Sequence, residues 1–257
     1  MKNKKSNRIV IITGASHGIG LASKKYFEDR GDIVIDFSRS SGVDVTNETQ
    51  VREAVAKIHA EHGRIDVLIN NAGFGISGSA ENTTSEAIQK LMSVNFTGTA
   101  ICCSAVLPYM REQKYGKIIN VSSVAAIFSL HFQSFYSASK AAVTSYTNAL
   151  RREVAPFGIK VCSVLPGDVN TDFATARKKN ENDDPAYQKA LTKAITKYER
   201  DEHKGAKPET MAKWFYRVSR KKNPKPYIVL GFKYKFFVFL TRFFPFRFVN
   251  WLVGKMY

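Results

Sequence analysis

The feature that most constrains the fold lies near the start of the chain, where an apolar run meets a glycine-rich segment. Ile9–Ile12 are four consecutive β-branched residues, and the segment TGASHGIG of residues 13–20 follows them directly. Such a run between polar flanks predicts a buried parallel strand. Residues 21–30 then read as a helix. A strand, a glycine turn and a helix N-terminus together favour the binding of an anion such as a phosphate.

Three glycines of this segment each have a physical use at such a site. Gly14 permits a tight turn, Gly18 the close approach of a pyrophosphate, and Gly20 the tight packing of helix on strand. A glycine-rich turn without a ligand is the alternative, and the strand and helix on either side argue against it.

Strand-like runs alternate with helical ones along most of the 257 residues. The expected strands are 9–12, 33–37, 67–70, 117–122, 160–165 and 226–230, and the expected helices are 21–30, 50–62, 85–110, 137–155 and 209–220. This alternation predicts an α/β fold with a doubly wound parallel sheet, the Rossmann fold. We expect a single domain over residues 1–231 and a separate C-terminal tail over residues 232–257.

The composition of the chain is that of an ordinary globular protein, except for its net charge. The chain has 39 Lys and Arg against 22 Asp and Glu, a net charge of +17. Its three cysteines, Cys102, Cys103 and Cys162, lie in apolar stretches, which is typical of buried reduced thiols in a cytoplasmic protein. No apolar segment precedes the first strand, so no signal peptide is expected. No metal-ligand spacing of Cys, His or carboxylates occurs, so no metal site is predicted.

A possible catalytic pair lies in the run Tyr136-Ser137-Ala138-Ser139-Lys140. Residues four apart share a face of a helix, so the phenol and the ammonium can point into the same pocket. A nearby cation favours the phenolate and lowers the pKa of a tyrosine from about 10. That is the requirement for a general acid or base at neutral pH.

Five ordered motifs then make the chain resemble the short-chain dehydrogenase/reductase family over residues 8 to 231. They are residues 13–20, Asn70-Asn71-Ala72-Gly73, Ser122-Ser123, the 136–140 run and Pro166-Gly167. The C-terminal extension resembles those of the hydroxysteroid and retinol dehydrogenases of the family. The resemblance implies an oxidoreductase that interconverts a carbonyl and a secondary alcohol with a nicotinamide cofactor.

The resemblance also assigns catalytic roles. It makes Tyr136 the proton donor or acceptor, and Ser123, thirteen residues earlier, the group that orients the substrate oxygen. Ser122 is the alternative serine, disfavoured by the family's spacing. Lys140 is implied to bind the nicotinamide ribose and to lower the pKa of Tyr136. Asn95, in the segment Ser93-Val94-Asn95-Phe96, is implied to hold a water in the proton relay.

The same resemblance extends to the cofactor, which we expect to be NADP(H) rather than NAD(H). Arg39, at the turn after the second strand, can clamp a 2′-phosphate. Asp36 is the competing carboxylate that an NAD site would use if the register slips by two residues. The implied cofactor-binding residues are Gly14, Ser16, His17, Gly18, Ile19, Gly20, Ser38, Arg39, Asp44, Val45, Asn71, Ala72, Gly73, Tyr136, Lys140, Pro166, Gly167, Val169 and Thr171.

Residues 173–207 are polar, charged and mostly helical, and they follow Pro166-Gly167. An insertion after the carboxyl end of a sheet strand lies where ligands bind, so we expect a lid over the substrate. A solvated pair of surface helices is the alternative.

Beyond Glu209 the chain has eleven Lys and Arg and no acidic residue, and its tail is rich in Phe. Basic residues interleaved with Phe and Trp251 suit an amphipathic helix in a membrane interface with anionic lipid. Pro245 is expected to divide the tail into two short helices, and its uncharged runs are too short to span a bilayer. The alternatives are a dimer interface, the far wall of a hydrophobic substrate pocket, and a core helix pair. The last is the least favoured, because the expected fold is complete by Gly231.

We therefore expect an NADP(H)-dependent oxidoreductase acting on a lipophilic substrate such as a steroid, a bile acid or another lipid-like ketone. The alternative reaction is 3-oxoacyl-carrier-protein reduction, because a basic surface attracts an acidic carrier. A non-catalytic, membrane-associated NADP-binding scaffold is the alternative from another class. The expected partners are an anionic membrane surface and a second copy in a homodimer formed through the long helices, but no nucleic acid. The expected location is the cytoplasm, with possible peripheral attachment to a membrane.

Overall fold

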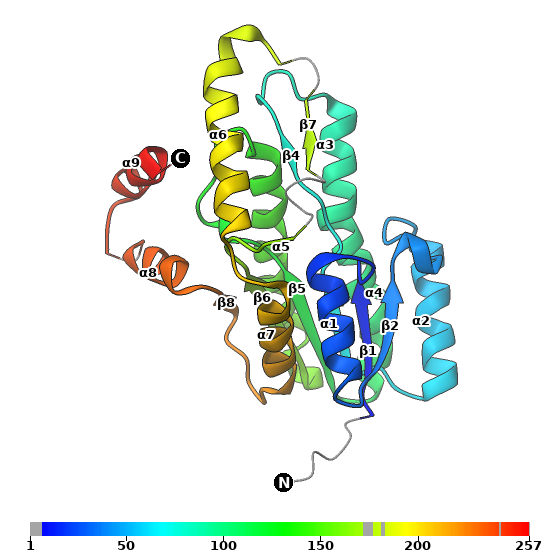
Figure 1. Cartoon of the computed structure of the whole chain (residues 1–257). Helices are drawn as coiled ribbons and strands as arrows, with labels where there is room; N and C mark the ends of the chain where they lie inside the picture. The colour runs from blue at the N-terminus through cyan, green and yellow to red at the C-terminus, as the bar shows by residue number, and fades with distance from the viewer. Residues whose placement is uncertain (1–6, 172–176, 181–182, 242, 257) are drawn as a thin grey trace.

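The computed structural model describes residues 7–171, 177–180, 183–241 and 243–256. Its centre is a parallel sheet in the order β2-β1-β3-β5-β6-β8 (Figure 1). The strands are β1 (Ile9–Thr13), β2 (Ile33–Phe37), β3 (Val67–Asn70), β5 (Gly116–Val121), β6 (Ile159–Leu165) and β8 (Tyr227–Val229). All neighbouring pairs in this sheet are parallel. The predicted doubly wound Rossmann fold is confirmed.

Helices α1 (Gly18–Glu28) and α7 (Pro208–Arg220) cover one face of the sheet, and α2 (Glu48–His62), α4 (Gly98–Glu112) and α5 (Ser134–Glu153) cover the other. Helices α3 (Ser85–Met92) and α6 (Pro185–His203) extend beyond the carboxyl ends of the strands (Figure 1). Ile9 and Ile11 of β1 pack in a core with α2 and α4, whereas Val10 and Ile12 pack on the other face with α1 and α7. Successive side chains of a strand point to opposite faces, so a strand buried on both sides is apolar throughout.

The order of the strands places a crevice at the carboxyl ends of β1 and β3. The chain passes from β1 to β2 on one side of the sheet and then returns to β3 on the other side of β1. At such a reversal the loops after the two strands separate, and the gap between them binds ligands. The glycine-rich loop follows β1, and the loop that contains Asn71, Ala72 and Gly73 follows β3.

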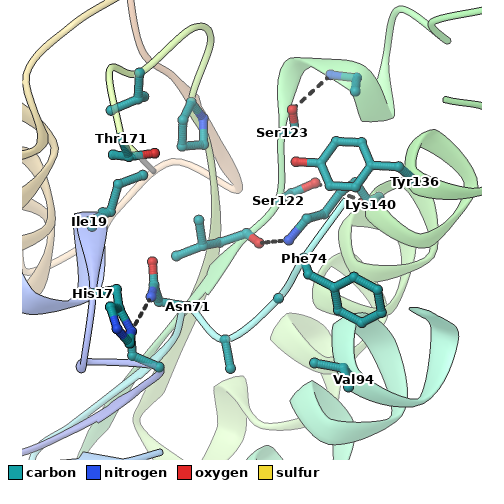
Figure 2. A pocket seen from close by; sticks show the side chains of 18 of the residues that line it. His17, Ile19, Asn71, Phe74, Val94, Ser122, Ser123, Tyr136, Lys140 and Thr171 are labelled. Atoms are coloured by element: carbon teal, nitrogen blue, oxygen red, sulfur yellow. Dashed lines mark hydrogen bonds between the residues drawn. The ribbon is translucent and has the colours of Figure 1, made fainter. Parts of the chain in front are cut away.

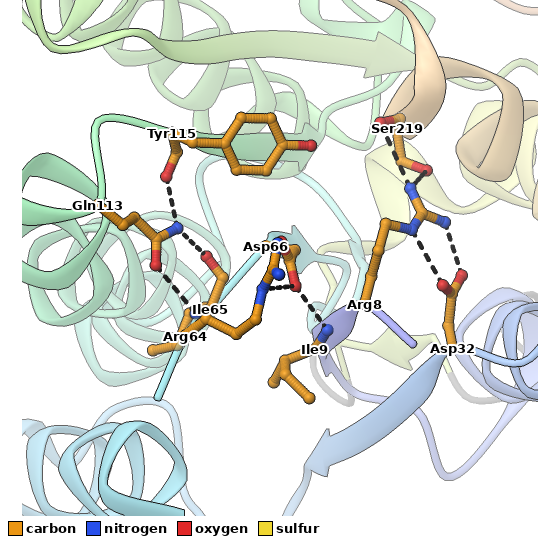
Figure 3. Close-up of polar contacts among 9 residues, drawn as sticks. All are labelled: Arg8, Ile9, Asp32, Arg64, Ile65, Asp66, Gln113, Tyr115 and Ser219. Carbon is orange, nitrogen blue, oxygen red and sulfur yellow. Dashed lines mark hydrogen bonds and ion pairs between the residues drawn. The ribbon is translucent and has the colours of Figure 1, made fainter. Parts of the chain in front are cut away.

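Polar contacts fix the opposite edge of the sheet (Figure 3). The Asp66 carboxylate accepts a hydrogen bond from the Ile9 backbone N–H at 2.8 Å, which joins the amino ends of β1 and β3. Arg8 donates to both carboxylate oxygens of Asp32, at 2.9 and 2.6 Å, and to the Ser219 hydroxyl of α7 at 3.0 Å. These contacts tie β1, the start of β2 and α7 together at the edge away from the crevice.

Some local boundaries differ from those expected. The expected helix 85–110 is divided by a π-helical turn, Ser93–Thr97, between α3 and α4. The two-residue strands β4 (Ile76–Ser77) and β7 (Lys178–Lys179) pair with each other and were not expected. Runs this short carry no periodic signal, and their pairing joins segments about a hundred residues apart.

Among the described residues, the stretch Ser85–Glu112 has the length and composition of a helix that could cross a membrane. Its residues Cys102, Cys103 and Val106 are buried in the larger core cluster. Buried core helices of globular proteins share this composition, so the stretch gives only weak evidence of a membrane span.

The C-terminal tail contains two short helices, α8 (Phe232–Leu240) and α9 (Phe246–Met256), on either side of Pro245. Tyr234 and Val238 of α8 and Val249 of α9 are buried in a small cluster with Phe128 and Leu165. One side of the tail therefore packs on the domain, which is the core role that the sequence made least favoured. Large aromatic residues of the tail remain exposed, namely Phe232, Phe236, Phe239, Phe243, Phe244, Phe248 and Trp251.

Candidate active site

A cavity of about 1200 Å³ occupies the crevice at the carboxyl ends of β1 and β3. Of the residues that the sequence proposed for the site, it is lined by Gly14, Ser16, His17, Gly18, Ile19, Ser38, Arg39, Asp44, Val45, Asn71, Ala72, Gly73, Ser123, Tyr136, Lys140, Pro166, Gly167, Val169 and Thr171. Gly20 and Asn95 do not line the cavity; they contact the segments that do. Figure 2 shows His17, Asn71, Tyr136, Lys140 and Thr171 among the side chains around this space.

The glycine-rich loop has the geometry expected for an anion cradle. Gly14 has φ +66°, and a Cβ there would lie 2.9 Å from the Ala72 Cα, so only glycine fits. A Cβ at Gly20 would lie 2.1 Å from the Gly14 carbonyl oxygen, which explains glycine at a residue outside the cavity. His17 is the N-cap of α1 and makes no side-chain capping bond, although its ring is 2.8 Å from the Ser16 hydroxyl. The first backbone N–H groups of α1 are therefore available to an anion, and the loop fits a dinucleotide pyrophosphate.

Two competing residues at the end of β2 are separated by the structure. Asp36 accepts hydrogen bonds from the Ala15 backbone N–H at 3.2 Å and from the Ser38 hydroxyl at 3.0 Å. It supports the glycine loop and does not line the cavity, whereas Ser38 and Arg39 do. Arg39 is exposed and lines the cavity.

Asp44 also lines the cavity, near Arg39. It accepts hydrogen bonds from the backbone N–H and the hydroxyl of Thr46, at 2.9 and 2.7 Å. These bonds lower the pKa of Asp44, and the positive charges of Arg39 and Lys90 lower it further. Lys90 also lines the cavity and was not proposed from the sequence.

Helix α5 presents Tyr136 and Lys140 on one face toward the cavity, and Ser123 faces them from the loop after β5 (Figure 2). The Lys140 ammonium donates to the Val121 carbonyl oxygen at 3.0 Å. The Ser123 hydroxyl oxygen accepts from the Ala125 backbone N–H at 3.1 Å. The neighbouring Ser122 hydroxyl donates to the Lys140 carbonyl oxygen at 2.8 Å, so it is already engaged in holding α5. This contrast supports Ser123 as the serine that meets a substrate.

The electrostatics of the pair differ from the expectation. Burial raises the pKa of Tyr136 to about 12, and the hydrogen bond with Ser123 only partly opposes this rise. Burial also lowers the pKa of Lys140 to about 8. The expected lowering of the Tyr136 pKa is therefore absent in the protein without cofactor. Desolvation disfavours both charged forms, and the Lys140 ammonium lies 5.9 Å from the centre of the tyrosine ring.

Asn95 lies in the π-helical turn, is almost fully buried and holds the loop after β3. Its side-chain amide accepts from the Phe74 backbone N–H and donates to the Phe74 carbonyl oxygen, both at 3.0 Å, and donates to the Ser139 hydroxyl at 3.0 Å. A Cβ at Gly73 would lie 3.0 Å from the Asn95 amide oxygen and 3.4 Å from the Lys140 ammonium. Asn95 is thus placed to position this loop, and its expected role with a water stays a prediction.

Several residues that line the cavity were not predicted individually from the sequence. The β5–α5 connection provides Phe128, Leu130 and Gln133, α6 provides Tyr198 and Glu202, and α8 provides Tyr234 and Phe237. The described part of the expected lid 173–207 therefore reaches the cavity through α6, while residues 173–176 and 181–182 lie outside the described residues. The Phe-rich composition of the tail was the one signal for the α8 contribution, as the far-wall alternative.

Comparisons with known proteins agree with this geometry. The family model described as short chain dehydrogenase matches residues 8–182. The chain belongs to the short-chain dehydrogenase/reductase family. A short-chain dehydrogenase from Streptomyces avermitilis has a similar solved structure, with a TM-score of 0.81 and 30% identity over 92% of this chain and 93% of that one.

Two relatives have named activities. The 3-ketodihydrosphingosine reductase of Bacteroides thetaiotaomicron is 42% identical over 84% of this chain and 85% of its own length. The 3-oxoacyl-[acyl-carrier-protein] reductase FabG of Chlamydia pneumoniae is 33% identical over 66% of this chain and 77% of its own length.

As a member of this family, the chain is an oxidoreductase that acts on CH–OH groups, and enzymes of the family bind NAD or NADP. Enzymes of the family act on small-molecule substrates and are commonly oligomeric. The cavity lined by the glycine loop, Tyr136 and Lys140 fits these properties.

Proposed function

We propose that this short-chain dehydrogenase/reductase uses NADPH to reduce a lipophilic, long-chain ketone to a secondary alcohol. The observation that carries the proposal is the composition of the cavity around Tyr136. Tyr136, Ser123 and Lys140 line the same cavity as the apolar side chains of Phe128, Leu130 and Phe237. Apolar walls favour an apolar substrate because its burial removes hydrocarbon surface from water.

The chemistry assigned to these residues follows from their protonation. A phenol with a pKa of about 12 is protonated at neutral pH, so Tyr136 is ready to donate a proton to the carbonyl oxygen of a ketone. Ser123 donates a hydrogen bond to the same oxygen and so fixes its position beside the phenol. With the cofactor bound, Lys140 would hold the ribose hydroxyls, and its positive charge would favour the developing alkoxide. When bound, the nicotinamide supplies the hydride.

The preference for NADP(H) rests on the end of β2. Asp36, the residue that an NAD site would need, is already bonded to Ala15 and Ser38. Arg39 and Lys90 both line the cavity and put positive charge near Asp44. Two cations at this end favour a ribose that carries a 2′-phosphate.

A long-chain ketone is preferred to a steroid or a bile acid because the 42% identical relative is a 3-ketodihydrosphingosine reductase. Reduction of 3-oxoacyl groups on a carrier protein is the second candidate, supported by the similarity to FabG and by the net charge of +17. That activity gives no reason for the aromatic residues of α8 at the cavity, so we rank it lower.

We also propose that the tail attaches the enzyme to an anionic membrane surface. Exposed aromatic side chains of α8 and α9 share the tail with Lys233, Lys235 and Arg247. Aromatic groups that enter the interface and basic groups that meet anionic headgroups together suit such attachment. A homodimer through α4 and α5 is proposed from the family resemblance alone.

The direct test is NADPH oxidation by the full-length protein with long-chain, steroid, bile-acid and acetoacetyl thioester ketones. We expect turnover of a long-chain ketone and a loss of about 10²- to 10⁴-fold in kcat for Tyr136→Phe, the range usual for a general acid. Tyr187→Phe is the matched control, because Tyr187 bonds with Glu81 and does not line the cavity. Turnover of the thioester alone would replace the proposal with carrier-protein reduction, and NADPH binding without any turnover would favour the scaffold.

A further inference from the structure

Helix α8 has a different environment on each of its two sides. Tyr234 and Phe237 line the cavity, whereas Phe232, Phe236 and Phe239 are 89%, 53% and 53% exposed. Residues three or four apart share one side of a helix, so the three exposed rings form a stripe opposite the two lining residues. A helix with its side chains is about 10 Å wide. A surface that meets the exposed stripe therefore lies about one helix diameter from the cavity.

A row of three aromatic rings joins the exposed stripe to the cavity. The ring centres of Phe236 and Phe237 lie 6.1 Å apart, and those of Phe237 and Phe128 lie 6.4 Å apart, both pairs edge to face. Phe128 and Phe237 line the cavity, and Phe237 is only half-buried. An alkyl chain that follows these rings stays in contact with apolar groups all the way from the surface to the cavity.

The other helices that line the cavity, α3, α5 and α6, have no large exposed apolar side chain among their described residues. The exposed residues of α6 include Lys189, Lys193 and Arg200. A hydrocarbon chain gains nothing from such a charged surface, whereas it is stabilised against exposed aromatic rings. The contrast makes α8 the side of the cavity at which a lipid-like molecule can enter.

The charge of the tail suits an anionic lipid surface as the partner of the exposed stripe. Lys233 and Lys235 are exposed in α8, and Arg247 is exposed in α9. The chain has no Asp or Glu after Glu209. Basic side chains beside exposed aromatic rings bind anionic headgroups while the rings enter the interface.

The contacts of α8 with the domain make it a cavity wall rather than a separate anchor. The Tyr234 hydroxyl donates a hydrogen bond to Asp168, and the Tyr234 ring packs against Gly167. Val238 is buried in the same cluster as Leu165. A membrane that meets the outer side of α8 is thereby held beside the cavity, instead of at the end of a flexible arm.

We propose that α8 is the entrance by which a long-chain ketone passes from an anionic membrane directly into the cavity, without release into water. Such a ketone is found in membranes and hardly in water, because each methylene group lowers its solubility in water about fourfold. The inference rests on the proposed ketone reductase function and on the proposed attachment of the tail. It adds the source of the substrate and the route by which it reaches Tyr136.

The first test compares substrate in the enzyme's own membrane with substrate in another membrane. Full-length protein is bound to phosphatidylserine-containing vesicles, and octadecan-3-one is placed either in these vesicles or in separate phosphatidylcholine vesicles at equal total lipid. Initial rates of NADPH oxidation are measured by rapid mixing, before the ketone exchanges between vesicles. We expect reduction to be at least tenfold faster from the enzyme's own vesicles. Octan-3-one is the control, because this short ketone equilibrates through water and should give equal rates in both arrangements.

The outcomes separate this inference from the proposed function. Equal rates for octadecan-3-one in the two arrangements would overturn the entrance and keep the reductase. Reduction of neither ketone would overturn the reductase function and the entrance with it.

A tethered variant separates an entrance at α8 from simple nearness to a membrane. The wild type and the double variant Phe236→Ser with Phe239→Ser are given an N-terminal hexahistidine tag and bound to vesicles that contain a nickel-chelating lipid. The tag holds the protein near the start of β1, at the edge of the sheet opposite the cavity. The rate with octan-3-one serves as the activity reference for each protein.

We expect the tethered wild type to keep its preference of at least tenfold for octadecan-3-one in its own vesicles. The tethered double variant should fall below about twofold, because it is on the membrane without an apolar surface at α8. Phe157→Ser is the matched control, since it removes an exposed ring just before the start of β6 and should keep the preference. Equal preference in the double variant and the wild type would overturn the entrance.

Discussion

The Tyr234 hydroxyl of α8 donates a hydrogen bond to the carboxylate of Asp168, at the residue that follows the Pro166-Gly167 turn. The same ring packs so closely on Gly167 that a Cβ there would lie 2.0 Å from it. The tail is thereby attached to the loop that lines the cavity. A segment with an exposed aromatic surface on one side forms part of the candidate substrate wall on the other.

Tyr234→Phe is expected to lower stability because it removes a hydrogen-bond donor from the half-buried carboxylate of Asp168. A hydrogen bond to a charged group contributes about 1.5–3 kcal/mol, so we expect Tm to fall by several degrees in thermal unfolding. Tyr227→Phe is the control, because the Tyr227 ring is exposed on β8. An unchanged Tm in Tyr234→Phe would show that the contact with Asp168 does not stabilise the tail.

Arg39→Ala is expected to raise KM for NADPH by about 10- to 100-fold, the loss expected for a charge-assisted bond to a phosphate. KM for NADH should stay within about threefold, because NADH has no 2′-phosphate for the guanidinium to bind. Arg52→Ala is a control on α2, where Arg52 pairs with Glu48. A wild type that prefers NADH would contradict the NADP(H) assignment.

The affinity for NADPH is expected to weaken as the pH rises through about 8. Lys140 has a pKa of about 8 in the folded protein without cofactor, so above that pH it loses the charge that attracts the cofactor. Titration of NADPH fluorescence between pH 6 and pH 10 measures this loss. Lys140→Arg should bind more weakly but with a flatter pH dependence, because a guanidinium stays protonated. The same pH dependence in both proteins would assign the titration to another group.

The titration of Lys140 should have the opposite effect on stability: affinity for NADPH falls as the pH rises, whereas the free energy of unfolding increases. The pKa of Lys140 lies below its ordinary value of 10.5, so the unfolded chain binds the additional proton between about pH 8 and pH 10.5. Relative to Lys140→Met, the free energy of unfolding of the wild type should therefore rise across this window. Denaturant unfolding at pH 7.5 and pH 10 checks this, and a fall in that difference would show that Lys140 is not desolvated in solution.

Membrane attachment of the tail predicts that the full-length protein floats with phosphatidylserine-containing vesicles and less so at high salt. The double variant Phe236→Ser with Phe239→Ser should lose most of this binding, since both rings are 53% exposed. Phe157→Ser removes an exposed ring elsewhere and is the control. Substitutions are preferable to removal of residues 232–257, because removal would also take Tyr234 and Val238 out of their cluster. If the wild-type protein does not float with anionic vesicles, the proposed membrane attachment is wrong.

The sequence predicted the sheet well because the signals for its strands are local. The β-branched residues of β1 and the glycine spacing after it are each contained in a few positions. Asn95 and Gly20 also had recognisable motifs, although neither turned out to line the cavity. The direction of the pKa shift of Tyr136 could not be predicted from the sequence, because it depends on how deeply the ring is buried and not on its spacing from Lys140.

What the sequence by itself determined was the family, the parallel α/β fold and the residues that gather around the glycine loop. Only the tertiary structure decided that Asp36 supports that loop from behind, and that Tyr234 and Glu202 complete the far wall. The physical reason is the range of the interactions. Strands and helices are determined largely by patterns of neighbouring residues, whereas a cavity wall is formed by contacts between segments far apart in the chain.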